Sequence, residues 1–342
     1  MISLHFKKNI YRIIAYFLVI ITLSVSFSKI RDSFAADAAD YIKWVEFNVP
    51  YNAMEKALGI DIKYHNTETP ISWIDLLACL ATKYGGNWTR YKSKDMDAFK
   101  EKFLSGETPE TIYNNNKYFS YFQEAYNACL GGFVGTYILE MPDKNNNNIL
   151  TAKTYYGLKA YSPIAEGFGY SHYDDFGNSR SYGFRRRHLG NDIIGTIGTP
   201  IIAVESGYVE VMAWNQYGGW RIGIRSLNKQ RYYYYAHLRK DHPYQSTLKE
   251  GDIVKAGDVI GYLGMTGYSV KENVNNISTP HLHFGMQIIF DESQKEGNNE
   301  IWIDVYKIVK LLSTHRSSVT KVAETKEYVR KYNFTDPVIP SG

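Results

Sequence analysis

Cysteine and strong net charge are both scarce in this 342-residue chain. The two cysteines, Cys79 and Cys129, lie in apolar stretches with helical spacing, away from the histidine motifs described below, so cysteine takes no part in that constellation. We expect two buried free thiols, although an exported location would also permit a disulfide. The formal net charge is +4, and neither a helix-turn-helix pattern nor an arginine-and-aromatic RNA-binding motif is present. The sequence therefore argues against nucleic acid as a partner.

Basic residues are nevertheless concentrated in one short segment, residues 180–187. Such a segment would suit an anionic surface, for example a polymer-bearing cell wall. A solvated loop is an equally good interpretation of the same residues. The sequence leaves both alternatives open.

Long apolar runs are also rare, and the one that stands out is N-terminal. Residues 13–28 are almost wholly apolar and are preceded by Lys7, Lys8 and Arg12. Counted over residues 10–30, the run is just long enough to span a bilayer. Basic residues before such a run place the N-terminus in the cytoplasm and the rest of the chain outside.

A cleaved secretory signal is the alternative for residues 1–35, with Ser33-Phe34-Ala35 as a small-residue cleavage site. Lys29, Arg31 and Asp32 lie between the apolar core and this site and weaken that interpretation. We favour an uncleaved transmembrane anchor in the cytoplasmic membrane, which makes the chain a single-pass membrane protein with its bulk outside. Cleavage would instead release the chain as a secreted or cell-wall protein.

Residues 40–140 are predicted to form a small helical domain. Within it, apolar residues of segment 71–81 recur at i, i+3, i+4 and i+7. Ser72 can cap the start of this helix, with Asp75 three residues later. Further helices with the same spacing are expected at residues 94–105 and 118–130.

This helical domain carries no residues with evident chemistry. Residues 76–88 faintly resemble a lysozyme-like domain, but residues 83–86, Lys-Tyr-Gly-Gly, stand where the catalytic glutamate of that fold is expected. We therefore predict a non-catalytic domain, either a spacer or a module that binds a protein partner.

A change of texture marks the second half of the chain. The polar tract at residues 145–148 indicates a linker, which we place at residues 141–160. Short β-branched and aromatic runs then alternate with Gly, Pro and Asn, as in all-β domains. Helical spacing returns at residues 303–312, and few apolar residues follow. We therefore expect a mainly β domain over residues 161–312 and a disordered or loose tail over residues 313–342.

Histidines and one aspartate form the pattern with the clearest chemistry. His281 and His283 lie in a predicted strand, so their side chains point to the same face. His188 and Asp192 have a spacing that places them on a common face, and His237 ends a third predicted strand. Neutral imidazoles and a carboxylate are the ligands that a borderline-soft divalent metal takes. Five such residues exceed the three protein ligands of a usual catalytic zinc site, and the surplus fits proton transfer in a hydrolase.

At these residues the chain resembles the lysostaphin/LytM-type zinc metallopeptidases, peptidoglycan endopeptidases that cut peptide cross-links in bacterial cell walls. The family pattern is His-x-x-x-Asp, then Tyr-Ala-His-Leu at a strand end, then Pro-His-Leu-His-Phe, and all three occur here in that order. The resemblance covers about residues 161–304. It implies a multidomain α and β protein whose mainly β peptidase domain has antiparallel sheets of the lipoyl/barrel-sandwich kind.

The resemblance also implies a role for each residue of the pattern. The expected zinc ligands are His188, Asp192 and His283. A fourth position is then left for water, as in catalytic zinc sites. His237 and His281 are expected to take the proton of the water and to protonate the leaving amine or steady the oxyanion, in an assignment that the sequence leaves open. Tyr182 is a further candidate donor to that oxyanion.

Aromatic residues near the pattern are candidates for substrate contact. Tyr235, in phase with His237 in the same predicted strand, could line the groove. Trp214 and Trp220 bracket residues 215–219, a predicted hairpin loop. The two tryptophans form either a wall for the substrate or a clamp that holds the hairpin.

Three functions are compatible with these features. The first is a zinc-dependent endopeptidase that hydrolyses amide bonds in the peptide stems or cross-bridges of peptidoglycan. The second is a non-catalytic scaffold or activator of a membrane or cell-wall complex, for example in sporulation, but no ligand position of the pattern has been lost here. The third is a lipoyl or biotinyl carrier with Lys255 at a hairpin tip, which gives no reason for His281 and His283.

Overall fold

The computed structural model describes residues 41–114, 116–143 and 149–339. It consists of two compact units that divide between Glu46 and Phe47, and the second unit contains all the elements described below. The membrane segment predicted at residues 1–35 lies outside the described residues. Within the described part of the chain, no helix combines the length and the apolar character needed to cross a bilayer.

Helices form the first part of the chain, as the periodicity predicts. α3 begins after Ser72, whose hydroxyl oxygen accepts a hydrogen bond from the Asp75 N–H at 3.3 Å, so the predicted cap is confirmed. It ends at Gly85, which has a left-handed backbone (φ 62°) that favours glycine. The helices of this part are α2 (Tyr51–Tyr64), α3 (Trp73–Tyr84), the 3-10 turn η1 (Trp88–Arg90), α4 (Ser93–Leu104), α5 (Pro109–Tyr113) and α6 (Lys117–Leu130).

Both cysteines lie inside this helical part. Cys79 in α3 and Cys129 in α6 are fully buried and are free thiols, so the prediction of two unpaired cysteines is confirmed. Burial raises the pKa of each thiol, which keeps both of them protonated and unreactive.

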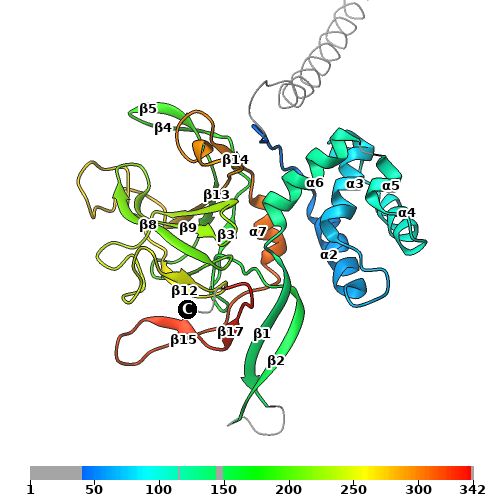
Figure 1. Ribbon diagram of the computed structural model, residues 1–342. Helices are drawn as coiled ribbons and strands as arrows, with labels where there is room; N and C mark the ends of the chain where they lie inside the picture. Colours follow the sequence, from blue (N-terminus) through cyan, green and yellow to red (C-terminus); the bar gives the residue numbers. More distant parts are fainter. Residues whose placement is uncertain (1–40, 115, 144–148, 340–342) are drawn as a thin grey trace, which may run out of the picture. The chain divides into compact units, whose positions relative to one another are not determined.

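Antiparallel strands form the second part, which confirms the predicted mainly β domain (Figure 1). The largest sheet has the strand order β11-β8-β9-β10-β13-β6-β3, with β14 also paired to β13, and β12 pairs with β7 in a separate two-stranded sheet. The strands of these sheets are β3 (Ser171–His172), β6 (Asn191–Ile194), β7 (Pro200–Ile202), β8 (Gly207–Asn215), β9 (Gly219–Ser226), β10 (Arg231–Ala236), β11 (Ile253–Val254), β12 (Val259–Tyr262), β13 (His281–Ile288) and β14 (Ile301–Ile303).

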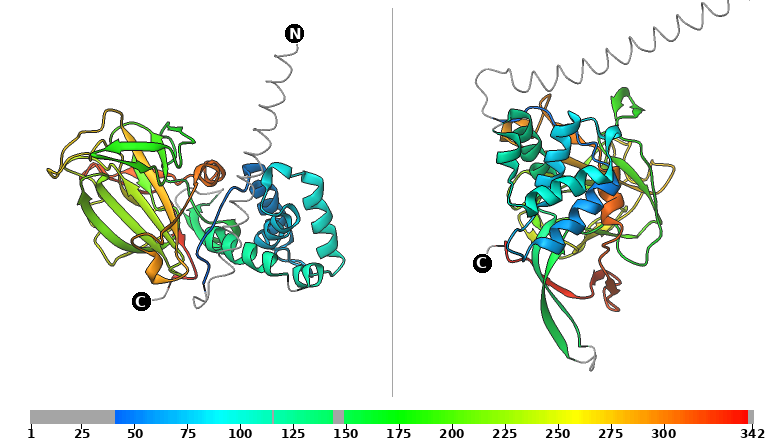
Figure 2. Two further views of the ribbon diagram at one scale, coloured as in Figure 1. Left: turned by 90° about the horizontal axis from the view of Figure 1, so that it is seen from above. Right: turned by 90° about the vertical axis from the view of Figure 1, so that its right-hand side faces the viewer.

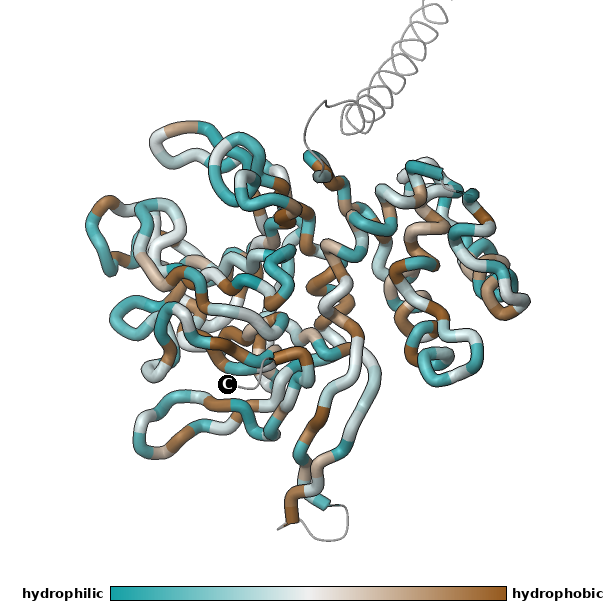
Figure 3. Tube along the Cα trace, in the orientation of Figure 1, coloured by the Kyte–Doolittle hydropathy of each residue, from teal (hydrophilic) through white to brown (hydrophobic). Residues whose placement is uncertain are grey.

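The two faces of the large sheet differ in chemistry because side chains alternate along each strand. The core face is apolar and almost fully buried, and it carries Ile193, Ile222, Ile224, Tyr233, Tyr235, Leu282, Phe284 and Met286. Burial of each such side chain stabilises the fold by about 1.5–3 kcal/mol. The other face of the sheet carries the polar residues. On that face His283 is the cross-strand neighbour of Asp192 in β6 and of Ala236 in β10. Figure 2 shows these strands side by side, and most of the outer loops are hydrophilic (Figure 3).

The prediction of a linker at residues 141–160 is wrong. β1 (Val134–Pro142) and β2 (Leu150–Leu158) pair over their whole length, from Val134 opposite Leu158 to Pro142 opposite Leu150. β1 and β2 are therefore the two strands of an antiparallel pair where the sequence predicts a linker (Figure 1). For the same reason the helices end at Leu130, before the limit of 140 predicted from sequence.

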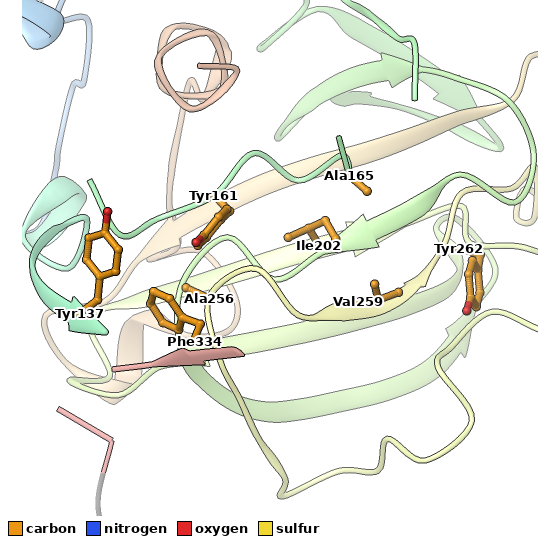
Figure 4. Close-up of a cluster of buried hydrophobic side chains, with 8 residues drawn as sticks. All are labelled: Tyr137, Tyr161, Ala165, Ile202, Ala256, Val259, Tyr262 and Phe334. Carbon is orange, nitrogen blue, oxygen red and sulfur yellow. The ribbon is translucent and has the colours of Figure 1, made fainter. Parts of the chain in front are cut away.

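The predicted loose tail, residues 313–342, is also wrong for the part that the structure describes. After α7 (Tyr306–Leu312), β15 (Val319–Lys321) pairs with β16 (Tyr328–Arg330), and β17 (Asn333–Thr335) pairs with β1. Phe334 is fully buried and its ring lies 5.6 Å from that of Tyr137 and 5.9 Å from that of Tyr161 (Figure 4). One buried ring and one edge pairing thus hold a segment whose average composition is polar.

One further strand pair completes the strands of the described residues. β4 (Ser179–Tyr182) and β5 (Phe184–Arg187) form a short hairpin that contains the basic segment seen in the sequence. β11 and β12, which the sequence suggests as one hairpin, pair with β8 and β7 in different sheets, so Lys255 is not at the tip of a carrier-type hairpin.

Candidate metal centre and groove

Three residues of the histidine pattern converge at one point of the polar face. His188, just before β6, Asp192 in β6 and His283 in β13 offer ligand atoms that all lie within 4.8 Å of one another. His188 Nε2 is 2.8 Å from His283 Nδ1 and 3.0 Å from Asp192 Oδ1, and His283 Nδ1 is 3.4 Å from the same oxygen. A tetrahedral zinc ion with bonds of about 2.0–2.1 Å places its ligands about 3.3 Å apart. The donor set and its spacing fit a divalent metal.

Gly190 allows the loop that carries His188 to approach β13. A Cβ atom on Gly190 would lie 2.6 Å from the Phe284 carbonyl oxygen and 2.8 Å from ring atoms of His283. Any side chain there would push His188 away from His283. The glycine of the Leu-Gly-Asn sequence between His188 and Asp192 is therefore a steric requirement of the site.

Two residues outside the predicted pattern hold these ligands in place. Asp175 accepts a hydrogen bond from the Asp192 N–H at 3.1 Å, and its Oδ2 lies 3.3 Å from His188 Nδ1. The Arg180 guanidinium donates to Asp192 Oδ2 at 3.0 Å and to Asp175. Asp192 therefore keeps Oδ1 facing the two imidazoles while Oδ2 is held by the arginine. Nothing in the sequence marks Asp175, whereas Arg180 lies in the basic segment.

The carboxylates and imidazoles of the centre strongly perturb one another. Burial by itself lowers the pKa of His188, but hydrogen bonds to Asp175 and Asp192 outweigh burial and raise that pKa to about 9. Burial favours the neutral form of Asp192, yet hydrogen bonds from His188 and His283 hold its pKa well below the usual range. Burial lowers the pKa of His283. Without a metal, the cluster thus combines a carboxylate with an imidazolium at neutral pH. A divalent cation can take the place of the imidazolium proton.

His237 and His281 lie beside this centre, with ring centroids 4.7 Å apart. The Nδ1 of His237 is 2.9 Å from the Thr266 carbonyl oxygen, and the Nδ1 of His281 is 2.8 Å from that of Thr279. A carbonyl only accepts, so each Nδ1 carries a proton and each neutral ring presents Nε2 as its basic nitrogen. Burial, and then the nearby His281 and His283, lower the pKa of His237 well below its usual value. Both imidazoles are therefore set up to accept or relay a proton.

A groove of about 640 Å³ opens over the centre and is lined by the three candidate ligands, His237 and His281. Tyr182 is not among its lining residues. The Tyr182 ring stacks on that of Tyr268 at 5.0 Å and meets the Tyr217 ring edge-on at 6.1 Å. Its role as an oxyanion donor stays a prediction.

Tyr235 does not line the groove, which corrects the sequence expectation. It is fully buried on the core face, and its hydroxyl oxygen accepts a hydrogen bond from the Val204 N–H at 3.0 Å. His237 has a left-handed backbone (φ 61°), so the alternation of β10 stops at Ala236 and Tyr235 is out of phase with His237. Tyr234 lines the groove instead, with its ring edge-on to His283 at 5.7 Å.

The structure favours the hairpin clamp as the role of the two tryptophans. Trp214 and Trp220 face each other across β8 and β9 with ring centroids 5.6 Å apart, and neither lines the groove. Trp220 Nε1 also donates to Asn273 Oδ1 at 2.9 Å. The residues that the hairpin brings to the groove are Tyr217 and Gly218, in the turn between the tryptophans.

Comparison with known proteins agrees with this site. Residues 186–299 match the model of peptidase family M23. The chain is 42% identical over 124 residues to the L-Ala–D-Glu endopeptidase of Bacillus subtilis (strain 168), and 36% of each chain is covered. It is 40% identical over 98 residues to lysostaphin of Staphylococcus simulans, which covers 28% of this chain and 17% of lysostaphin. This chain thus spans about a third or less of the length of these relatives.

Among solved structures, the catalytic domain of lysostaphin from Staphylococcus simulans is 32% identical, with a TM-score of 0.33, and the match covers 41% of this chain and 92% of that domain. Residues 186–299, which match the family model, contain all five residues of the histidine pattern. The polar face of this β domain carries a His-Asp-His cluster. The domain belongs to the LytM-type peptidases of family M23, as the sequence motifs predict.

Proposed function

We propose that this protein is a zinc-dependent endopeptidase that hydrolyses amide bonds in the peptide part of peptidoglycan. The observation that carries the proposal is the convergence of His188, Asp192 and His283 with two further imidazoles in one groove. The names of the relatives support it, because an L-Ala–D-Glu endopeptidase and lysostaphin are among them. A relative from Vibrio cholerae, 35% identical over 99 residues, is a peptidoglycan DD-endopeptidase.

In this proposal the zinc ion would be held by His188, Asp192 and His283, which all line the groove. Zinc held there would act as a Lewis acid and supply the activation of water and of the scissile carbonyl. His237 and His281 line the same groove with Nδ1 bonded to a backbone carbonyl, so Nε2 of one of them would take the proton of the attacking water. The other delivers a proton to the leaving amine or donates to the oxyanion. His281 Nε2 lies 3.6 Å from Asp192 Oδ1, beside the proposed ligands.

The L-Ala–D-Glu bond is the first bond to test, because the relative with that name is 42% identical to this chain over 124 residues. The proposed location is outside the cytoplasmic membrane, with residues 1–35 as the anchor. Peptidoglycan is extracytoplasmic, so this topology is a condition of the proposed activity.

The test uses the full chain, purified in detergent, with metal analysis and digestion of purified peptidoglycan followed by mass spectrometry. We expect about one zinc per chain, with release of peptide fragments that a chelator stops and added zinc restores. Intact peptidoglycan with zinc-loaded protein would contradict the proposal and support the scaffold alternative.

Variants separate metal binding from proton transfer. His283→Ala should lose the zinc, whereas His237→Ala and His281→Ala should keep it and lose about 10²–10⁴-fold in turnover. His65→Ala, at an exposed position of the helical part, is the control for removal of a histidine as such. Full zinc content in His283→Ala would overturn the ligand assignment, and loss of zinc in either of the other two would overturn the division of roles.

A further inference from the structure

Arg186 is fixed in the wall of the groove by two tyrosines from distant segments. Its guanidinium carbon lies 4.9 Å from the ring centroid of Tyr217, in the β8–β9 turn, and 5.3 Å from that of Tyr268. Its Nη2 also donates to the Tyr268 hydroxyl oxygen at 3.1 Å. The planar group is therefore held in one orientation before any ligand arrives, which lowers the entropy cost of binding an anion.

The charge of Arg186 has no counter-ion in the protein. Among the described residues, no carboxylate oxygen lies within ion-pair distance of Arg186, and its Nη1 is buried without a hydrogen-bond partner. Arg180 is different, because Asp175 and Asp192 both pair with it. The groove is lined by Arg186 and Arg187, and Asp192 is the one carboxylate among its lining residues. An oriented cation with unused donors, in a groove that also holds a metal-type centre, attracts an anionic ligand.

Tyr268 places this cation next to the reaction centre. The Arg186 guanidinium lies over the Tyr268 ring, and the same ring lies 5.9 Å, edge-on, from that of His237. A single aromatic ring thus separates the guanidinium from an imidazole of the proposed proton relay. The distance between the Arg186 guanidinium and the His237 ring is at most the sum of their distances to the Tyr268 ring, 5.3 and 5.9 Å. At about 3.3–3.6 Å per extended residue, about three residues of a bound peptide cover that distance.

We propose that Arg186 forms a carboxylate-binding subsite, which selects peptide substrates with a free carboxylate within about three residues of the scissile amide. This inference rests on the proposed endopeptidase function and narrows its substrate class. The guanidinium offers a carboxylate its positive charge and N–H donors beyond the one that Nη2 gives to Tyr268. An α-carboxylate of D-glutamate that is linked through its γ-carboxyl and a C-terminal carboxylate of a short stem share this chemistry.

The test compares three acetylated peptides with the sequence L-Ala–D-Glu–L-Lys, the glutamate linked through its γ-carboxyl. One peptide has both carboxylates free, the second has the glutamate α-carboxylate amidated, and the third has the C-terminal carboxylate amidated. If the peptidoglycan digest identifies another bond, the same set is built around that bond. We expect zinc-loaded protein to hydrolyse the free-acid peptide with a kcat/KM ~10- to 100-fold above that of one amide, since a charged hydrogen bond is lost there. The amide that reacts slowly identifies which carboxylate binds.

Arg186→Gln should reduce the acid-to-amide ratio of kcat/KM to near one, and Arg186→Lys should give an intermediate ratio because it keeps the charge without the guanidinium donors. Arg185→Gln is the matched control: it removes the same charge from the neighbouring, exposed position of β5, which does not line the groove, and it should keep the wild-type ratio. Equal rates for the three peptides with wild-type protein would overturn the subsite and leave the endopeptidase function intact. No hydrolysis of any of the peptides or of peptidoglycan would overturn the function itself.

Discussion

Replacement of Asp175 by asparagine tests whether the carboxylate behind the proposed ligands tunes the metal centre. Asparagine keeps the size of the side chain and an oxygen that can accept the Asp192 N–H, now at 3.1 Å from Oδ1. Its amide nitrogen, however, donates, and it would face the donors of Arg180 and of His188 Nδ1, which lies 3.3 Å from Asp175 Oδ2. The backbone carbonyl of Asp175 still accepts from His188 Nδ1 at 3.1 Å, so the imidazole is loosened but not released.

This arrangement sets the expected size of the effect. Loss of a partner behind a metal ligand typically costs 10–100-fold in affinity, or about 1.4–2.8 kcal/mol. We expect Asp175→Asn to weaken zinc binding by an amount in this range. A chromophoric chelator that competes for zinc at fixed pH measures the dissociation constant. Asp174→Asn removes the same charge at the adjacent exposed position and is the matched control.

A second measurement on the metal-free protein checks the cause. The hydrogen bond to Asp175 is one of the interactions that raise the pKa of His188 to about 9. The pKa of His188, followed by NMR, should therefore fall in Asp175→Asn and stay unchanged in Asp174→Asn. A wild-type zinc affinity, or a loss as complete as that of His283→Ala, would refute the reasoning, because the first denies any influence of Asp175 and the second makes it a ligand.

Other predictions concern the fold, acid stability and topology. Phe334→Ala should lower the free energy of unfolding by about 3–5 kcal/mol in urea titrations, because it empties a fully buried position between two tyrosine rings; an unchanged midpoint would mean that the tail does not pack there. Burial lowers the pKa of His172 to about 4, so the unfolded chain binds a proton there first and the metal-free protein should lose up to roughly 3 kcal/mol as pH falls from 6.5 to 4. His172→Phe should flatten this slope, and a slope equal to that of the wild type would exclude His172 as its source. Protease added to intact protoplasts should remove the peptidase domain and leave a short membrane-bound stub from residues 1–35; full protection would place the domain in the cytoplasm and exclude a cell-wall substrate.

Local patterns predict the parts of this protein that depend on neighbours in sequence. Ser72 caps α3 because an N-cap needs only residues within one turn. His281 and His283 share a face because strand alternation has a period of two. The same rule places Tyr235 wrongly, since the left-handed backbone of His237 interrupts the alternation one residue after β10 ends.

The sequence by itself therefore determined the peptidase motifs and the helical and β parts. Only the tertiary structure decided which side chains surround the motifs. Contacts between loops or strands far apart in the chain position Asp175, the Arg186 guanidinium and the buried ring of Phe334. A rule based on composition or spacing carries no signal for such contacts. The tail is polar on average, but it packs through the ring of Phe334. The residues that contact this ring lie in β1 and near Tyr161, almost two hundred residues earlier in the chain.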